Sequence, residues 1–236
     1  LCRAPEGNRV NVCDIRFQSG VLAACRFLST SSTTSSPQTS ERLLGIVVAA
    51  LETLASSAPE LSAGSALDTT VSAQDAAVET FTKSVVSGLV SICFKNPPLC
   101  SVIVSGAIAP FLRAVLEGGA VGRRLRSHVA RGALTSLSTS EQLTTLSGLR
   151  QEDISSIAAV LETCVLKYAS DPLLPQALCV LARLVASPSC PEDRASSTFR
   201  VATSHDLVSE EFVASITLAA ACAERLPSLV PDLHSI

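Results

Sequence analysis

The chain has 236 residues, of which 47% are apolar and 17% are charged, and its formal net charge is -3. This composition provides enough apolar material for a continuous core and argues against intrinsic disorder. The small net charge gives no global field that would attract nucleic acid or an anionic membrane. Aromatic residues make up only 3%, with no Trp, which argues against modules that stack bases on aromatic side chains.

A glycine recurs along the chain at Gly20, Gly64, Gly106 and Gly148, with separations of 44, 42 and 42 residues. Each of these glycines precedes a short apolar run. A period near 42 falls within the window of about 40–47 residues that is typical of paired or tripled helices stacked in an array. Every unit of such an array buries its apolar face against its neighbours. The spacing therefore predicts an all-α fold with these glycines at turns between helices.

The first two units are predicted over 8–56 and 59–95. In the first, a helix continues to residue 28, a polar Ser/Thr-rich insertion occupies 29–40, and a further apolar helix covers 43–54. In the second, the clearest element is a long apolar helix over 81–94.

The third unit, over 96–140, has the most regular pattern. Pro97 and Pro98 end the preceding helix, because proline cannot donate a backbone hydrogen bond and restricts the residue before it. A short helix over 99–104, a sharp turn at Gly106 and an apolar helix over 107–116 then follow. A long helix over 124–137 completes the unit, with apolar residues recurring at three- and four-residue steps.

A fourth unit is predicted over 141–187, with helices at 154–165 and 173–185. Residues 188–198 are polar and contain prolines, so we expect a loop insertion there. An apolar helix over 212–226 belongs to a partial unit or cap over 199–236.

The third unit resembles the armadillo repeat. The resemblance implies a right-handed α-solenoid of about four repeats plus a partial C-terminal cap, forming one domain over 1–236. The HEAT repeat, with two helices per unit, is the alternative; the short extra helix and the turn at Gly106 favour armadillo. The matching residues are Asn96-Pro97, Gly106-Ala107-Ile108, Pro110-Phe111-Leu112, Val115-Leu116, Ala133-Leu134 and Leu137.

The resemblance also implies a partner-binding groove lined by the third helix of each unit. Several armadillo proteins hold an extended peptide there with an Asn side chain, often beside a Trp. Ser and Thr have less reach than Asn, so we expect the groove to accept a packed helix or another protein's surface; ordinary solvated helix positions are the alternative. The residues at the Asn positions are Thr53, Ser91, Ser136 and Arg183, and those at the Trp positions are Ala49, Ser87, Gly132 and Cys179.

A second candidate binding surface, the basic turn, gathers five arginines around one predicted turn. Guanidinium groups form forked hydrogen bonds with carboxylates, so the cluster predicts contact with an acidic segment or helix of a partner. A solvated charged surface is the alternative. The members are Arg113, Arg123, Arg124, Arg126 and Arg131.

Signatures of catalysis are missing from the sequence. The glycine-rich stretch 118–124 lacks the spacing of a phosphate-binding loop. His128, His205 and His234 have no metal-ligand partner at helical spacing, and neither a Cys-x-x-Cys nor a Gly-x-Ser-x-Gly motif occurs. We therefore expect no enzymatic activity, no cofactor and no metal.

The cysteines and the apolar runs indicate in which cellular compartment the protein is located. Nine cysteines without paired spacing predict reduced, buried thiols and a cytoplasmic location. No apolar run reaches the roughly 18–20 residues needed to span a bilayer, so no membrane span is expected. Residues 26–32 look like the end of a mitochondrial transit peptide, but a helix followed by a polar insertion is favoured. The absence of Met suggests a fragment or a processed form.

We expect a non-catalytic protein–protein interaction scaffold, a structural or adaptor subunit of a larger assembly that binds other proteins. The family resemblance suggests cytoskeletal or ciliary assemblies. The alternatives are a transport adaptor that binds cargo peptides and a regulatory domain cut from a multidomain enzyme.

Overall fold

The chain is all-helical wherever its structure is described. No strand occurs in these ranges, which confirms the all-α prediction. The computed structural model describes residues 12–30, 37–57, 73–117, 123–139, 150–167, 173–203 and 210–229.

Helices make up nearly all of the described residues. They are α1 (Ile15–Thr30), α2 (Pro37–Ser57), α3 (Ala73–Lys95), α4 (Pro97–Ile103), a π-helical segment η1 (Val104–Ile108), α5 (Ala109–Glu117), α6 (Arg123–Thr139), α7 (Gln151–Lys167), α8 (Leu174–Ala186), α9 (Glu192–Thr203), α10 (Glu210–Arg225) and a 3₁₀ turn η3 (Pro227–Leu229).

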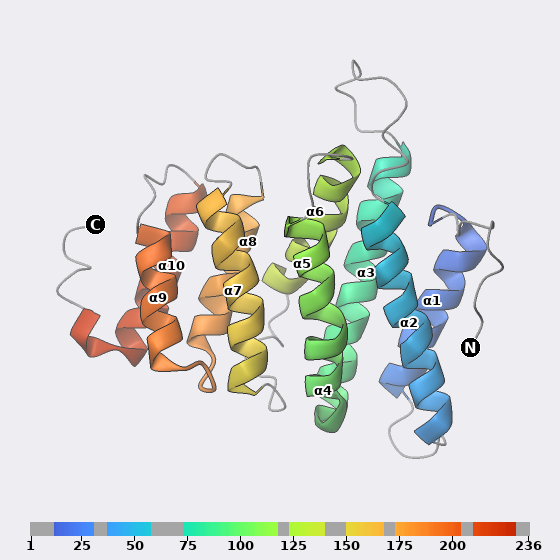
Figure 1. Ribbon diagram of the computed structural model, residues 1–236, viewed down its shortest axis with the longest axis horizontal. Helices are drawn as coiled ribbons and strands as arrows, with labels where there is room; N and C mark the ends of the chain where they lie inside the picture. The colour runs from blue at the N-terminus through green and yellow to red at the C-terminus, as the bar shows by residue number, and fades with distance from the viewer. Residues whose placement is uncertain are drawn as a thin grey trace.

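The helices pack in two series, which we call row A and row B. In row A, α1 contacts α3, α3 contacts α6, α6 contacts α8, and α8 contacts α10. In row B, α2 contacts α5, α5 contacts α7, and α7 contacts α9. Figure 1 shows the helices side by side along the long axis, with α1 toward one end and α10 toward the other. Row A helices run in one direction across the view and row B helices run in the other.

The core lies between and within these rows. In α8, for example, Leu174, Ala177, Leu178 and Leu181 are buried at three- and four-residue steps, as expected of an amphipathic helix that faces neighbours on most sides. Pro residues in the first turns of α4 and α8 cost no hydrogen bond, because those N–H groups have no partner within the helix.

Gly106 does not form the predicted turn. It lies in η1, and the helix continues from α4 through η1 into α5, because Val104 and Ala109 keep right-handed helical backbone angles. A π-helical segment adds a residue without ending a helix. The apolar stripe around Gly106 is buried without interruption, which outweighs the roughly 1 kcal/mol preference of glycine for non-helical backbone. Gly20 likewise lies inside α1, whereas Gly64 and Gly148 lie outside the described residues.

Two predicted insertions are shorter than expected. The loop expected over 188–198 is wrong from Glu192 onward, where α9 begins. Glu192 and Asp193 favour the first turn of a helix, and Ala195, Thr198 and Phe199 are buried at helical spacing beneath the polar residues. The insertion expected over 29–40 is also too long, because α1 extends to Thr30 and α2 begins at Pro37; residues 31–36 lie outside the described ranges.

The order of helices predicted for the first unit is wrong as well. The predicted third helices of the later units correspond to α3, α6 and α8 in row A, but that of the first unit corresponds to α2 in row B. The row A member of that region is α1, whose Phe17 ring packs edge to face on Phe81 of α3 with centroids 6.1 Å apart.

Two helical stretches, Asp75–Lys95 and Pro97–Leu116, are long and apolar enough to cross a membrane by length and composition. Uninterrupted apolar runs did not reveal them, because a few polar residues divide each stretch. In the 18-residue apolar window of each stretch, 50% and 56% of the positions are buried. Core helices of a globular domain have the same character, so length and composition alone establish no membrane span.

Candidate functional site

The predicted groove residues do not share one face. Thr53 lies on α2 in row B, whereas Ser91, Ser136 and Arg183 lie on row A helices. The Thr53 hydroxyl donates a hydrogen bond to the Ala49 carbonyl oxygen of its own helix at 2.7 Å. Ser136 is only 3% exposed, so it cannot contact a partner, and its hydroxyl oxygen has no hydrogen-bond partner among the described residues. The prediction of a single row of groove side chains is therefore wrong for Thr53 and Ser136.

The structure describes only part of the basic turn. Arg113 is exposed on α5, and Arg131 is half-buried on α6. Arg123, Arg124 and Arg126 lie in the first turn of α6, but their side chains are outside the described part of the chain. A single arginine surface remains a prediction.

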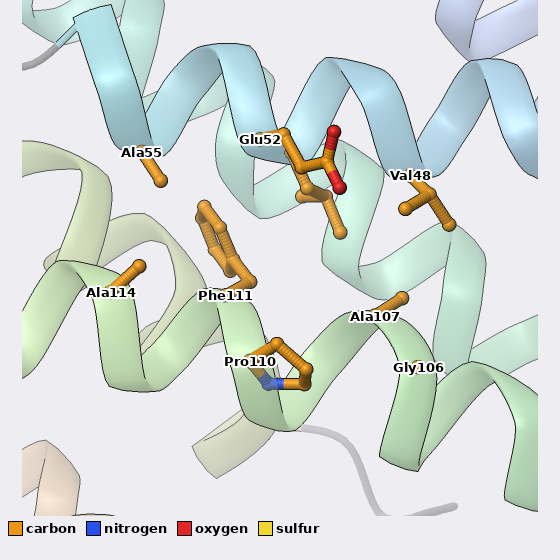
Figure 2. A pocket seen from close by; sticks show the side chains of 9 residues that line it. Val48, Glu52, Ala55, Gly106, Ala107, Pro110, Phe111 and Ala114 are labelled. Atoms are coloured by element: carbon orange, nitrogen blue, oxygen red, sulfur yellow. The ribbon is translucent and has the colours of Figure 1, made fainter.

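An apolar groove of about 230 Å³, which the sequence analysis missed, lies between α2 and the η1–α5 segment. Figure 2 shows the two helices side by side with this space between them. Leu51, Ala107 and Phe111 are buried and form its floor. The lining residues are Val48, Leu51, Glu52 and Ala55 from α2, and Gly106, Ala107, Pro110, Phe111 and Ala114 from η1 and α5.

Small residues account for the open space. Gly106, Pro110 and Ala114 recur every four residues, so they form one exposed stripe along η1 and α5. Ala55 is the corresponding small residue on the α2 wall. Larger side chains at these positions would fill the space between the helices. The four-residue spacing is visible in the sequence, but only the pairing of α2 with α5 turns it into a groove wall.

Among the described residues that line the groove, Glu52 alone is charged. It is exposed and stands on the α2 wall (Figure 2). Every other lining residue is apolar or glycine. The groove therefore combines an apolar floor with one negative charge at its edge, an arrangement that suits an amphipathic ligand.

Buried polar side chains elsewhere join helices. The Glu162 carboxylate of α7 accepts hydrogen bonds from Arg194 Nη1 of α9 at 2.8 Å and from the Thr198 hydroxyl. His128 Nδ1 of α6 lies 3.0 Å from Glu79 Oε2 of α3. These groups have partners within the fold, as buried polar groups require, and none of them lines the groove.

Burial and hydrogen bonding shift the pKa of several buried thiols. Burial raises the pKa of Cys25 to about 11 and that of Cys222 to about 11. Burial also raises the pKa of Cys190, and its hydrogen bond with Arg225 partly offsets this. Cys93 and Cys100 are hydrogen-bonded to each other, which raises the pKa of Cys93 and lowers that of Cys100. Burial raises the pKa of a thiol because the thiolate loses its hydration away from water. In the Cys93–Cys100 hydrogen bond, the pKa of the thiol that donates is raised and that of the thiol that accepts is lowered.

In the part of the chain that the structure describes, no group of three or more His, Cys, Asp or Glu side chains could hold a metal ion. Comparison of the chain with models of protein families, with curated proteins and with solved structures finds no match.

Proposed function

We propose that the chain is a non-catalytic protein-binding scaffold whose α2–α5 groove receives an amphipathic helix of a partner protein. The observation that carries this proposal is the groove itself, with its buried apolar floor and the lone carboxylate of Glu52 on its wall. Apolar grooves between helices bind amphipathic helices in many proteins.

The proposed architecture is a right-handed solenoid of armadillo- or HEAT-like units with a partial C-terminal cap. The alternation of helices between row A and row B supports it, because stacked helix pairs give this contact order. The uninterrupted helix from Pro97 to Glu117, followed by α6, favours a two-helix unit of the HEAT kind at this place. In this proposal the chain serves as a structural or adaptor subunit in the cytoplasm.

The chemistry of the groove defines the partner helix. An aliphatic or aromatic side chain of the partner fits over Leu51, Ala107 and Phe111. A Lys or Arg one turn away on the same helix would face Glu52, since residues three or four apart share a helix face. Such a pair at the rim mainly sets orientation and specificity, and the apolar anchor supplies most of the affinity.

The test is selection of helical peptides from a displayed random library on the purified chain. We expect the selected peptides to share an apolar anchor with a basic residue three or four positions away. Binding of one such peptide is then measured by fluorescence anisotropy. Ala114→Trp fills the groove and should weaken binding at least about tenfold, whereas Ala76→Trp, at an exposed position of α3, is the matched control.

A charge exchange tests the role of Glu52. Glu52→Lys should weaken binding of the basic peptide, and changing the peptide's basic residue to Glu should restore it. Selected peptides that bind Ala114→Trp as tightly as the unaltered chain would contradict the proposal.

A further inference from the structure

The two ends of row A expose large apolar side chains. On α1, Ile15 is 77% exposed and Phe27 is 43% exposed; on α10, Val213 is 63% exposed, beside exposed Phe212 and Ile216. A helix of a stacked array normally carries polar residues on the face that meets solvent. The first and last described helices of row A, α1 and α10, both depart from this pattern.

These side chains lie opposite the packed faces of their helices. On α10, Ala214 and Leu218 are buried, whereas Phe212, Ile216 and Ala220 are exposed. Residues two positions apart on a helix differ by about 200° in direction. The exposed stripe of α10 therefore faces away from the buried one. On α1, likewise, Cys25 and Leu28 are buried while Ala23 and Phe27 are exposed.

We propose that copies of this chain associate head to tail, with α10 of one copy packed on α1 of the next so that row A continues from copy to copy. Among the described helices, each inner helix of row A packs on a row A neighbour at both sides, whereas α1 and α10 each contact one. The helices are equally long, with 16 residues each, and run in the same direction in Figure 1. A second α1 would thus meet α10 in the parallel orientation that row A uses throughout.

The sequences of the two helices match in this orientation. Placing Phe212 opposite Ile15 brings Ile216 to Ser19 and Ala220 to Ala23, and it brings Glu224 beside Arg26 and Phe27. Large apolar residues meet at one end, small residues in the middle and opposite charges at the other end. Small residues at helix contacts already occur within row A, where Gly88 of α3 lies against Cys25 of α1.

Charge complementarity identifies a second copy as the occupant. Arg26 and Glu224 are both exposed, and neither forms an ion pair within the described residues. Arg16 adds a second exposed cation to the α1 face. A contact between two different surfaces of the same chain leaves one surface open on each end of a pair, so it builds a closed ring or an open filament.

The test is sedimentation velocity of the full chain at roughly 10–200 μM, where a micromolar Kd is measurable. We expect the mass-average sedimentation coefficient to rise with concentration. Arg26→Glu and Glu224→Arg should each weaken association about tenfold, as should Ile216→Arg. Arg42→Glu, an exposed charge reversal on α2, should leave association unchanged.

Two recombinations of the variants make the test specific to a head-to-tail contact. The double variant Arg26→Glu/Glu224→Arg should regain association, because opposite charges meet again. A mixture of the two single variants should regain it as well, because every contact in an alternating assembly then joins unlike charges. A chain that stays monomeric over the whole range overturns the proposal, and so does association that survives all the single variants or fails to return in the mixture.

Discussion

Gly132 of α6 lies so close to α3 that a Cβ atom on it would come within 2.5 Å of the Glu79 carbonyl oxygen. The same atom would approach Thr82 Cβ at 3.1 Å and the Lys83 nitrogen at 3.2 Å. These atoms belong to the body of a helix and cannot rotate away. The close packing of α3 and α6 therefore depends on the missing side chain at position 132.

Gly132→Ala should destabilise the fold. Alanine improves helix propensity by about 1 kcal/mol, but the added methyl group must push two packed helices apart, which typically costs about 1–3 kcal/mol or more. Because the obstacle is backbone, we expect a net loss of about 1–2 kcal/mol in the free energy of unfolding. Urea unfolding followed by circular dichroism measures it.

The matched control is Gly45→Ala in α2, where nothing lies within 4 Å of the added atom. This variant should gain about 0.5–1 kcal/mol, because only helix propensity changes. Equal effects of the two substitutions would contradict the close packing at Gly132.

Helical spacing predicts much of the core. The helix predicted over 107–116 has apolar residues at three- and four-residue steps, which places one set of side chains on its inner face. All five members of this set are buried: Ile108, Phe111, Leu112, Val115 and Leu116. The periodicity carries this information because a packed helix has one dominant apolar face, whatever its neighbours are.

The candidate site was less predictable, because it depends on which helices are neighbours. Ser136 aligned with a groove position, but α6 packs against both α3 and α8, so this face of the helix is covered. Nothing in the sequence around Ala114 predicts a binding role, and this residue lines the groove only because α2 lies beside α5. The same limit applies to Gly132, whose role is set by its distance to Glu79 and not by its own sequence context.

Removing Arg194 should leave the Glu162 carboxylate uncompensated. Glu162 is buried, and Arg194 is partly exposed, so Arg194→Met should lose about 2–3 kcal/mol of unfolding free energy. In Glu162→Met/Arg194→Met the buried charge is gone, and the Thr198 hydroxyl can donate to the carbonyl four residues earlier in α9. We expect this double variant to recover most of the loss in a double-mutant cycle. Additive losses would mean that the pair is not coupled.

Arg225 joins the end of α10 to two backbone carbonyls. Its Nη1 donates to the Val185 carbonyl oxygen and its Nη2 to that of Cys190, which satisfies groups just inside and beyond the end of α8. A lysine keeps the charge but cannot donate in this fork, so Arg225→Lys should cost about 1–2 kcal/mol. Arg200→Lys on the exposed side of α9 is the control and should change the urea midpoint little. A midpoint that is unchanged in Arg225→Lys would show that the forked contact does not stabilise the fold.

The buried thiols make stability depend on alkaline pH. Cys25 and Cys222 have pKa values of about 11 in the fold, because burial disfavours the thiolate, against 9.0 for an ordinary thiol. Between pH 9 and 11 the unfolded chain gives up protons that the native chain keeps, so stability falls as pH rises. The stability that each protonated thiol contributes is fully present below pH 9 and is lost as the pH rises through 11, amounting to about 2–3 kcal/mol for each thiol.

Urea unfolding at a series of pH values tests this dependence. The free energy of unfolding should decline less steeply with pH in Cys25→Ala/Cys222→Ala than in the unaltered chain. The control is Val21→Ala, a substitution of a buried residue of α1 that does not titrate. It should lower the free energy of unfolding but keep its dependence on pH. Equal pH dependence in all three proteins would show that the thiols do not cause the alkaline loss of stability.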